Sequence, residues 1–495
     1  MKGMNMKNRF LFLLVLLVSV LLAGWQFAMA QSETNEPDAT FSTVTYLPIV
    51  AKHYPWYNPF GVESNALLRN GTPYLQHSSA LPAGWLRMNG RISWRALQPN
   101  EGDPIDWSKL AGFEAELRAI RDAGIRPIVI VDDYPRWATD NTVRDDGQPT
   151  SCGPLLPERY DDFAAFMTEL VMRYRTSEFN VHEWEMGNEP DVDPNLVSPD
   201  MVFGCWGDYD ELYYNGDAYG EMLKVVTPAV RAADPIARVW IGGLLLDNPN
   251  TQNPNHIGRP ELFLKGILEA GAAPYFDVVA YHGYVSYNGK RVDQDTAAGR
   301  VWDSWGGIML GKARFLRDIM SDYGVDKPLF ADETGMTCIW CTPDQPDMLQ
   351  MQADFLVRAF PRSLSEDIIG FTWFTLDGPG FYNSSLLDIN QNPRPVYYAY
   401  QTLISNLVNA EYYGTANYGA GIEGYEFRRD WGGADGRQAV HIVWAYEDVT
   451  LIAAVPQSDF IAAYTRDGDP ISPTPSGDDY LFSITFEPIY IIRKW

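Results

Sequence analysis

The stretch Glu183-Trp184-Glu185-Met186-Gly187-Asn188-Glu189-Pro190 sets the pattern for the whole chain. Polar and apolar residues alternate from 181 to 186, and this alternation predicts a β-strand. Gly187 and Pro190 mark the end of that strand. A carboxylic acid, Glu189, therefore follows directly on the strand's C-terminal end. In closed barrels of parallel strands, the reacting groups gather at that end.

A second acid occupies a similar position further along the chain. Leu329-Phe330-Ala331-Asp332-Glu333-Thr334-Gly335 is an apolar strand that runs into Glu333 and is stopped by a glycine. Two carboxyl groups at the ends of two strands are what glycoside hydrolysis requires. The pair Glu189 and Glu333 is therefore the first candidate for a catalytic centre.

The chain between these acids and around them alternates strand and helix signals. Near-continuously apolar strands are buried on both faces, as in a parallel sheet. Eight such strands with helices between them close most simply into a (β/α)8 TIM barrel, which we expect over residues 58–408. An open doubly wound sheet is the alternative, but the Gly-rich phosphate loop typical of it is missing. The expected strands cover residues 60–63, 85–89, 126–131, 181–186, 237–246, 276–281, 329–333 and 370–376.

The pattern changes after about residue 408. Short alternating segments separated by Gly, Asp and Pro replace the helical periodicity, and the last of them covers residues 480–492. This pattern predicts a small antiparallel β-sandwich domain over residues 409–495. The expected fold class is therefore α/β, with a TIM barrel followed by a β-sandwich.

The N-terminus has the features of an export signal. Lys2, Lys7 and Arg9 precede an apolar run over residues 11–23, and Ala28-Met29-Ala30 is a small-x-small cleavage site. Residues 1–30 are therefore expected to be a secretory signal peptide. An uncleaved anchor helix is the alternative, although the run is short for a membrane span. Residues 31–57 are expected to be a linker, within which residues 45–50 could instead pack as an edge strand.

Charge and cysteine content agree with a secreted protein. The net charge of −26 disfavours nucleic acid and anionic membrane surfaces as partners. Four cysteines in an exported chain suggest disulfides. Cys338 and Cys341 are close in sequence, and their pairing would leave Cys152 for Cys205, but the sequence allows three connectivities. A zinc site is the other option, but no histidine lies near either cysteine cluster.

Residues 58–495 resemble the clan A glycoside hydrolases, the retaining (β/α)8 group, and are closest in pattern to family 39 and similar β-glycosidases with a C-terminal β-sandwich. The resemblance rests on motifs at the strand ends, of which Asn188-Glu189-Pro190 on the fourth strand is the clearest. A segment near the second strand, Trp94 with Pro99-Asn100-Glu101-Gly102 and Asp106-Trp107, is similar to a clan motif, except that Gln98 precedes the proline. The other matching positions are Arg87, His282, Tyr284, Glu333 and Trp373.

The resemblance implies a role for each position. Glu189 would be the general acid and base, and Glu333 the nucleophile. Arg87 would hold Glu333 ionised, because its guanidinium is a permanent cation. Five positions would bind the substrate: Asn188 at the sugar 2-hydroxyl, Arg87, His282, Tyr284, which would also hydrogen-bond the nucleophile, and Trp373 as a flat platform under the ring. No metal and no cofactor is expected, and the partner is a carbohydrate.

Each residue also has a structural interpretation. Glu189 could be an acid in the first turn of a helix, His282 a core histidine and Trp373 plain core. Two other functions use the same scaffold. One is a catalytically inactive carbohydrate-binding or cell-surface protein, and the other is a transglycosylase. The expected function is a secreted retaining glycoside hydrolase, while the sugar, the linkage, endo or exo action and the oligomeric state stay open.

Overall fold

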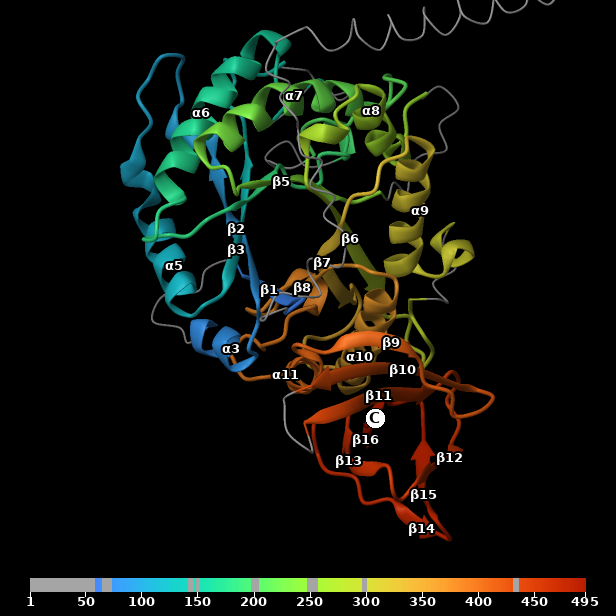
Figure 1. Cartoon of the computed structure of the whole chain (residues 1–495). Coiled ribbons are helices and arrows are strands. Elements are labelled where there is room, and N and C mark those ends of the chain that lie inside the picture. The colour runs from blue at the N-terminus through green and yellow to red at the C-terminus, as the bar shows by residue number, and fades with distance from the viewer. Residues whose placement is uncertain are drawn as a thin grey trace, which may run out of the picture. The chain divides into compact units, whose positions relative to one another are not determined.

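The computed structural model describes residues 58–64, 74–140, 147, 152–196, 204–246, 257–295, 301–430 and 436–495. Eight parallel strands form a closed barrel in sequence order, with β1 pairing β8 to complete it. The predicted TIM barrel is therefore confirmed (Figure 1). Its strands are β1 (Phe60–Ser64), β2 (Trp85–Ser93), β3 (Arg126–Asp132), β4 (Glu183–Met186), β5 (Arg238–Leu244), β6 (Val278–Ser286), β7 (Leu329–Thr337) and β8 (Phe371–Trp373).

Helices follow most of the strands and cover the barrel from outside. The side chains that β4 and β8 turn outward, such as Trp184 and Trp373, are fully buried against this layer. The burial on both faces explains why the strands read as continuous apolar runs. The helices are α3 (Tyr74–Ala80), α4 (Trp94–Leu97), α5 (Ala111–Asp122), α6 (Tyr160–Tyr174), α7 (Gly216–Ala233), α8 (Phe263–Glu269), α9 (Ile308–Asp322), α10 (Pro346–Ser365) and α11 (Pro395–Leu407).

The barrel interior is filled in layers, because side chains of a strand alternate between inside and outside. The lowest layer is an apolar plug made of Trp85, Ile128, Trp240, Val278, Ala280 and Phe330. On three of these strands, the inward position two residues further along carries an ionisable side chain. Trp85 is followed by Arg87, Ala280 by His282, and Phe330 by Asp332. This apolar plug therefore lies directly beneath a layer of ionisable groups.

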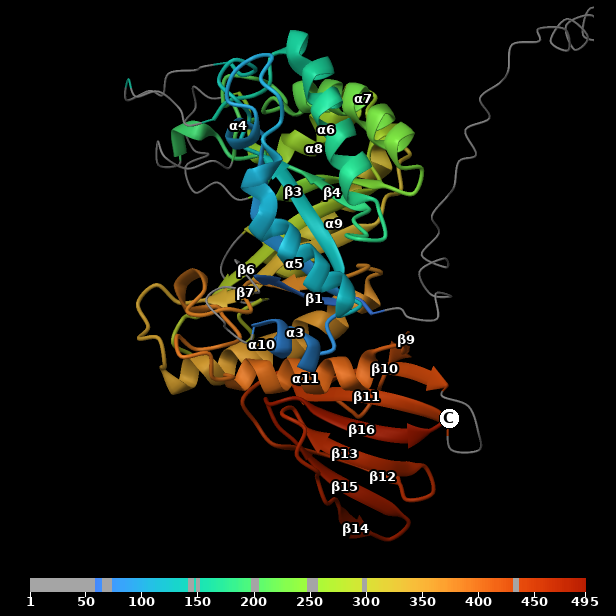
Figure 2. The ribbon, with the colours of Figure 1, turned by 90° about the vertical axis from the view of Figure 1, so that its left-hand side faces the viewer.

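The C-terminal part forms two antiparallel sheets, as predicted, which share a core of residues from both. Helix α10 contacts β10 (Figure 2). Arg362 on this helix forms a bidentate ion pair with Glu423 on β10. The strands are β9 (Glu411–Thr415), β10 (Ile422–Asp430), β11 (Arg437–Ala445), β12 (Leu451–Pro456), β13 (Phe460–Thr465), β14 (Thr474–Ser476), β15 (Asp479–Ile484) and β16 (Ile489–Lys494).

One predicted strand is wrong in detail. The segment 480–492 is not continuous: β15 ends at Ile484 and β16 begins at Ile489, and the two strands belong to different sheets. The break falls at Glu487-Pro488, where a proline cannot donate to a strand ladder.

The expected boundaries are tested only in part. The predicted signal peptide (1–30) and linker (31–57) lie outside the described residues. Helix α11 ends at Leu407 and β9 begins at Glu411, next to the predicted boundary, but independent folding of the two parts stays a prediction. Within the described ranges, no helix has the length and apolar character that crossing a membrane requires.

Candidate active site

Arg87 is the centre of the charged layer above the apolar plug. It lies on β2, and its side chain is fully buried. Its guanidinium is bidentate on Glu185 of β4, at 2.8 and 2.6 Å, which is the strongest geometry for such a pair. The same group donates to Glu63 Oε2 at 2.7 Å, Asn188 Oδ1 at 2.7 Å and Glu333 Oε1 at 2.5 Å, and its Nε lies 3.2 Å from Asp332 Oδ2.

Four carboxyl groups around one arginine leave a surplus of negative charge. Burial strongly raises the pKa of both Glu63 and Asp332, and neighbouring carboxylates raise it further. Both Oδ atoms of Asp332 and Oε1 of Glu63 are buried without a hydrogen-bond acceptor or donor among the described residues. Burial therefore disfavours the carboxylate form of these two acids, whereas Glu333 faces the cationic Arg87 and His282.

Glu333 lies on β7 and is held as an anion. Burial raises its pKa, but the charges of His282 and Arg87 and the hydrogen bond from Tyr284 together lower it below the ordinary value. The Tyr284 hydroxyl donates to Oε2 at 2.6 Å, and Arg87 donates to Oε1. Both oxygens are thus fixed by donors from two other strands, Tyr284 on β6 and Arg87 on β2. An ionised, oriented carboxylate is the form needed for nucleophilic attack.

His282 connects the two candidate carboxyl groups. Its Nδ1 lies 2.8 Å from Glu189 Oε1 and 3.5 Å from Glu333 Oε2. Burial alone would lower the pKa of His282, but Glu333, Asp332 and Glu189 raise it to about 9. The ring is therefore protonated at neutral pH, and Nδ1 donates to Glu189. This cation further stabilises the anion on Glu333.

Glu189 stands just past the end of β4 in an unusual backbone conformation. Its φ is +48°, in the left-handed region that non-glycine residues rarely adopt. The backbone N–H of Glu189 donates to Gly243 O on β5 at 3.1 Å and fixes this conformation. Strained backbone of this kind persists only where the surroundings enforce it, and it concentrates at functional sites.

Two buried ionisable side chains support the loop beneath Glu189. Asp191 is fully buried and accepts the backbone N–H groups of Leu245 and Leu246, at 2.9 and 2.7 Å. Lys312 on α9 donates its Nζ to Leu245 O at 2.7 Å and to His282 O at 2.9 Å. The end of β5 is thereby held from both sides, so that the acid on β4 and the histidine on β6 keep their spacing.

The structure corrects the role expected for Trp373. Its side chain is fully buried, donates from Nε1 to Ser384 O at 2.7 Å, and packs on Phe355 of α10 with ring centroids 6.2 Å apart. Its face is therefore not open to a sugar. The next residue, Phe374, is half-buried, and its ring contacts that of Tyr284 at 5.9 Å. Strand alternation puts Phe374, and not Trp373, on the inner side.

The other expected site residues lie together in the mouth. Asn188 accepts from Arg87 through its oxygen, which leaves the hydrogens of its Nδ2 amide to offer to a sugar hydroxyl. Glu63, Asp191 and Asp332 were not predicted as site residues. Asp332 directly precedes Glu333 in the seventh strand, and Glu63 is the only acid of the first strand, so both had a signal in the strand pattern.

Glu189, His282 and Glu333 are also close enough together to be compared with a metal site. One ligand atom each of Glu189, His282 and Glu333 lies within 4.8 Å of the others. However, Arg87 already contacts Glu333 and the protonated His282 has no lone pair to give at Nδ1. The arrangement therefore fits proton transfer between carboxyl groups better than the binding of a cation.

The cysteines pair as two disulfides, Cys152–Cys205 and Cys338–Cys341. Both pairs follow strand ends at the mouth of the barrel, since Cys338 comes directly after β7 and Cys205 lies in the segment between β4 and α7. A zinc site at the cysteines is thereby ruled out for this structure.

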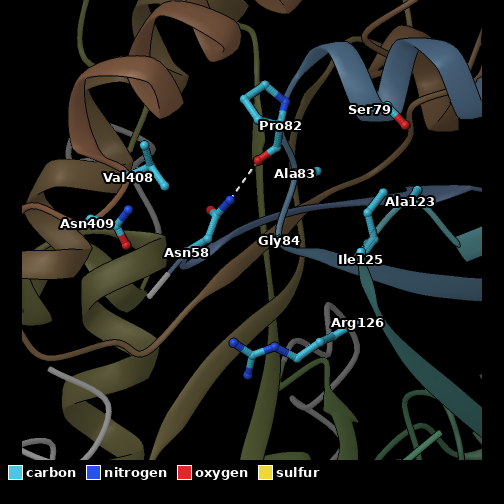
Figure 3. A pocket seen from close by; sticks show the side chains of 11 residues that line it. Asn58, Ser79, Pro82, Ala83, Gly84, Ala123, Ile125, Arg126, Val408 and Asn409 are labelled. Carbon is cyan, nitrogen blue, oxygen red and sulfur yellow. Dashed lines mark hydrogen bonds between the residues drawn. The ribbon is translucent and has the colours of Figure 1, made fainter. Parts of the chain in front are cut away.

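A cavity of about 640 Å³ lies away from these residues (Figure 3). Gly84 and Arg126 line it, and these residues stand at the N-terminal ends of β2 and β3. Asn58, which precedes β1, reaches across it to donate to Pro82 O at 2.6 Å. The cavity is therefore at the end of the barrel opposite to Glu189 and Glu333. Residues at that end of a TIM barrel contribute to stability.

Comparison with known proteins bears on the fold. Neither a protein-family model nor a curated protein sequence matches the chain. A family 39 glycoside hydrolase from Bacteroides cellulosilyticus WH2 is similar in structure, with a TM-score of 0.63 and 18% identity over 88% of this chain and 81% of that one.

Two further structures are similar at lower identity. A family 30 endoxylanase from Clostridium papyrosolvens C71 has a TM-score of 0.56 and 12% identity over 89% of this chain and 97% of its own. A monomeric β-xylosidase from Caulobacter crescentus CB15 has a TM-score of 0.55 and 16% identity, covering 88% and 96%. The chain therefore has the fold of family 39 and family 30 glycoside hydrolases, a closed (β/α)8 barrel followed by antiparallel sheets.

Proposed function

We propose that this protein is a secreted retaining glycoside hydrolase with Glu333 as nucleophile and Glu189 as general acid and base. One observation carries the proposal. A carboxyl oxygen of Glu189 and one of Glu333 lie within 4.8 Å of each other at the C-terminal mouth of the barrel. Retaining glycosidases place their two carboxyl groups about 5–5.5 Å apart, while inverting enzymes leave room for a water molecule between them.

The first step forms a covalent intermediate. A carboxylate oxygen of Glu333 attacks the anomeric carbon, the bond from that carbon to the leaving oxygen breaks, and Glu189 gives its proton to the leaving oxygen. Arg87 and Tyr284 hold Glu333 in place for the attack. In the second step Glu189, now a carboxylate, takes a proton from water. The water oxygen bonds to the anomeric carbon and releases Glu333.

His282 and Asn188 assist without changing covalently. The charge of His282 lies beside both carboxyl groups, so it favours the anionic form of Glu333 before attack and of Glu189 after proton transfer. The amide of Asn188 is suited to the sugar 2-hydroxyl, a contact that strengthens in the transition state. In other enzymes with two catalytic carboxyl groups, different surroundings likewise make one group the acid and the other the nucleophile.

Two observations support the proposed substrate class: the groups on the inner surface of the mouth and the substrates named for similar proteins. The inner surface offers a carboxylate, a phenol and an aromatic ring, which suit a neutral pyranose. Two of the structurally similar proteins are an endoxylanase and a β-xylosidase. A β-linked xylose-containing oligosaccharide is therefore the first substrate to test. Export is part of the proposal: the N-terminal sequence supports it, and the two disulfides agree with it.

The test is hydrolysis of a panel of aryl β-glycosides, including xylosides and glucosides, with proton NMR of the first-formed sugar. The proposal expects turnover with release of the β-anomer. Glu333→Gln keeps the shape of the site and removes the nucleophile, so it is the matched control. Release of the α-anomer would overturn retention. Binding of oligosaccharides without turnover would favour the inactive carbohydrate-binding protein, and new linkages to an acceptor sugar would favour the transglycosylase.

A further inference from the structure

The segment after β8 forms a short turn with two large aromatic side chains in the solvent. The 3-10 turn η8 covers Phe381–Asn383. Phe381 is 49% and Tyr382 46% exposed, and their ring centroids are 4.4 Å apart. Adjacent exposed aromatic rings are uncommon unless they meet a partner.

The exposed pair is continuous with the candidate active site. The ring of Phe381 lies 5.7 Å from that of Tyr284, centroid to centroid. The hydroxyl of Tyr284 in turn donates to Glu333. An oligosaccharide with one sugar at Glu333 would therefore pass these rings with its next sugar.

The backbone of the turn is strained and firmly held. Tyr382 has φ 46° and ψ 48°, and Asn383 has φ 70°, so two successive non-glycine residues are left-handed. Each such residue costs on the order of 1 kcal/mol or more, and persists where the surroundings impose it.

Contacts from two elements impose this conformation. Cys338 N donates to Tyr382 O at 2.9 Å, and Gln352 on α10 donates to Asn383 O at 2.8 Å. The Asn383 amide donates to the carbonyl oxygens of both Cys338 and Cys341, at 3.4 and 3.3 Å. The disulfide between these cysteines closes the loop that holds the turn. The rings are thus fixed before any ligand arrives, which reduces the entropy lost on binding.

We propose that Phe381 and Tyr382 form an aromatic subsite that binds a second sugar of a β-linked oligosaccharide, next to the sugar at Glu333. The inference rests on the proposed function and adds to it that the protein acts on chains and not only on single glycosides. The turn carries no charged side chain, and a flat ring offers its face to the apolar C–H side of a neutral pyranose.

The test separates the subsite from the catalytic centre by the leaving group. β-Xylosyl fluoride has no second sugar, whereas xylo-oligosaccharides do. β-Glucosyl fluoride and cello-oligosaccharides form the second pair of probes. The variants are Phe381→Ala and Tyr382→Asn, since asparagine tolerates the left-handed backbone. Tyr413→Ala on β9 is the matched control, because Tyr413 is also an exposed aromatic residue and lies in the C-terminal sheets.

The subsite predicts that kcat/KM on oligosaccharides falls about tenfold in each variant, corresponding to ~1.4 kcal/mol. The kcat/KM on the fluoride should change by no more than about twofold in each variant. Both kcat/KM values of Tyr413→Ala should stay within the same limit, because surface substitutions usually have small effects. An equal fall on fluoride and oligosaccharide would overturn the subsite, because the rings would then support the centre itself. Unchanged oligosaccharide kinetics would also overturn it.

Calorimetric titration with the same oligosaccharides keeps the two proposals apart. If the wild-type protein hydrolyses neither fluoride, the hydrolase proposal fails. The subsite then stands if oligosaccharide binding is weakened about tenfold in Phe381→Ala and Tyr382→Asn and not in Tyr413→Ala. It falls if the wild-type protein binds none of the oligosaccharides.

Discussion

Replacing Arg87 by methionine tests the charged layer under the active site. Methionine keeps an unbranched, similarly long side chain and removes the cation. Arg87 makes five hydrogen bonds, two to Glu185 and one each to Glu63, Asn188 and Glu333. Removing one partner of a buried ion pair costs ~3–5 kcal/mol, because the other charge stays buried without compensation.

The expected loss spans that range, because it depends on pH. The acids around Arg87 can take up protons to relieve their repulsion, and this is easier at low pH. The free energy of unfolding should therefore fall by about 3 kcal/mol at pH 5 and by about 5 kcal/mol at pH 8. A typical domain has about 5–15 kcal/mol of stability, so the variant should still fold. Urea denaturation at the two pH values measures both numbers.

The same variant should change the pH profile of activity. The Arg87 charge lowers the pKa of Glu333, so its removal moves the acid limb of kcat/KM to higher pH. Arg238→Met is the control, because Arg238 is also bidentate on a barrel glutamate, Glu183, but does not contact Glu333. The control should lose stability without moving the acid limb. A loss below about 1 kcal/mol at both pH values, or an unmoved limb, would refute this account of the layer.

Three further predictions concern packing, pH and the disulfides. Gly243→Ala should lower the free energy of unfolding by ~1–3 kcal/mol and reduce activity, because an added Cβ would lie 2.1 Å from His282 Nε2. The control Gly112→Ala should not destabilise the protein, since no atom lies within 4 Å of its added Cβ. Equal thermal unfolding of the two variants would contradict this prediction. Stability should fall between about pH 4 and pH 7, since acids with raised pKa stay protonated in the folded protein after the unfolded chain has lost its protons; His441, with its pKa lowered to about 4, opposes this trend. Burial raises the pKa of Asp132 and Asp191 to about 7 and of Asp295 and Asp354 to about 6. The Tm measured by calorimetry should therefore be higher at pH 5 than at pH 8, and the reverse order would contradict this prediction. Replacing Cys152 and Cys205 by alanines should lower the free energy of unfolding by ~4 kcal/mol, because this disulfide closes a loop of 53 residues. The same change at Cys338 and Cys341, which are 3 residues apart, should cost less. The reverse order in denaturant titration would contradict this prediction.

Much of the barrel and the pair of acids could be predicted from local sequence. A parallel strand buried on both faces leaves an apolar run, and a polar residue where it ends is placed at the mouth by the topology alone. Glu189 and Glu333 both follow this rule. Arg87 and Tyr284 do too, because their strands enter the barrel in the same direction.

The orientation of a very short strand could not be predicted. Strand β8 has three residues, and the aromatic pair Trp373-Phe374 fits either parity. Packing on α10 decides it: Phe371 stacks on Phe360 at 4.4 Å, and alternation then turns Trp373 outward as well. The outward orientation of Trp373 is set by contacts with α10, a helix that precedes β8 in the chain. No local sequence pattern around Trp373 therefore predicts it.

The sequence also could not predict which acids from distant strands surround Arg87. Glu63 and Asp332 are 269 positions apart, by subtraction of their residue numbers, yet both lie on Arg87. Which of four acids carry protons depends on burial and on mutual distance, and neither is encoded locally. The sequence indicates the ionisable residues, while their protonation states emerge only in the folded barrel.

Azide rescue of two variants tests the assignment of the catalytic roles most directly. With Glu333→Ala, an aryl glycoside should react slowly unless azide is added, and the glycosyl azide formed should have inverted configuration, because azide attacks in place of the nucleophile. With Glu189→Ala, a dinitrophenyl glycoside should still form the covalent intermediate, and azide should give the β-glycosyl azide with retention. Retained product from Glu333→Ala and inverted product from Glu189→Ala would mean that the roles are exchanged. Unchanged activity of both variants without azide would contradict the assignment of the active site.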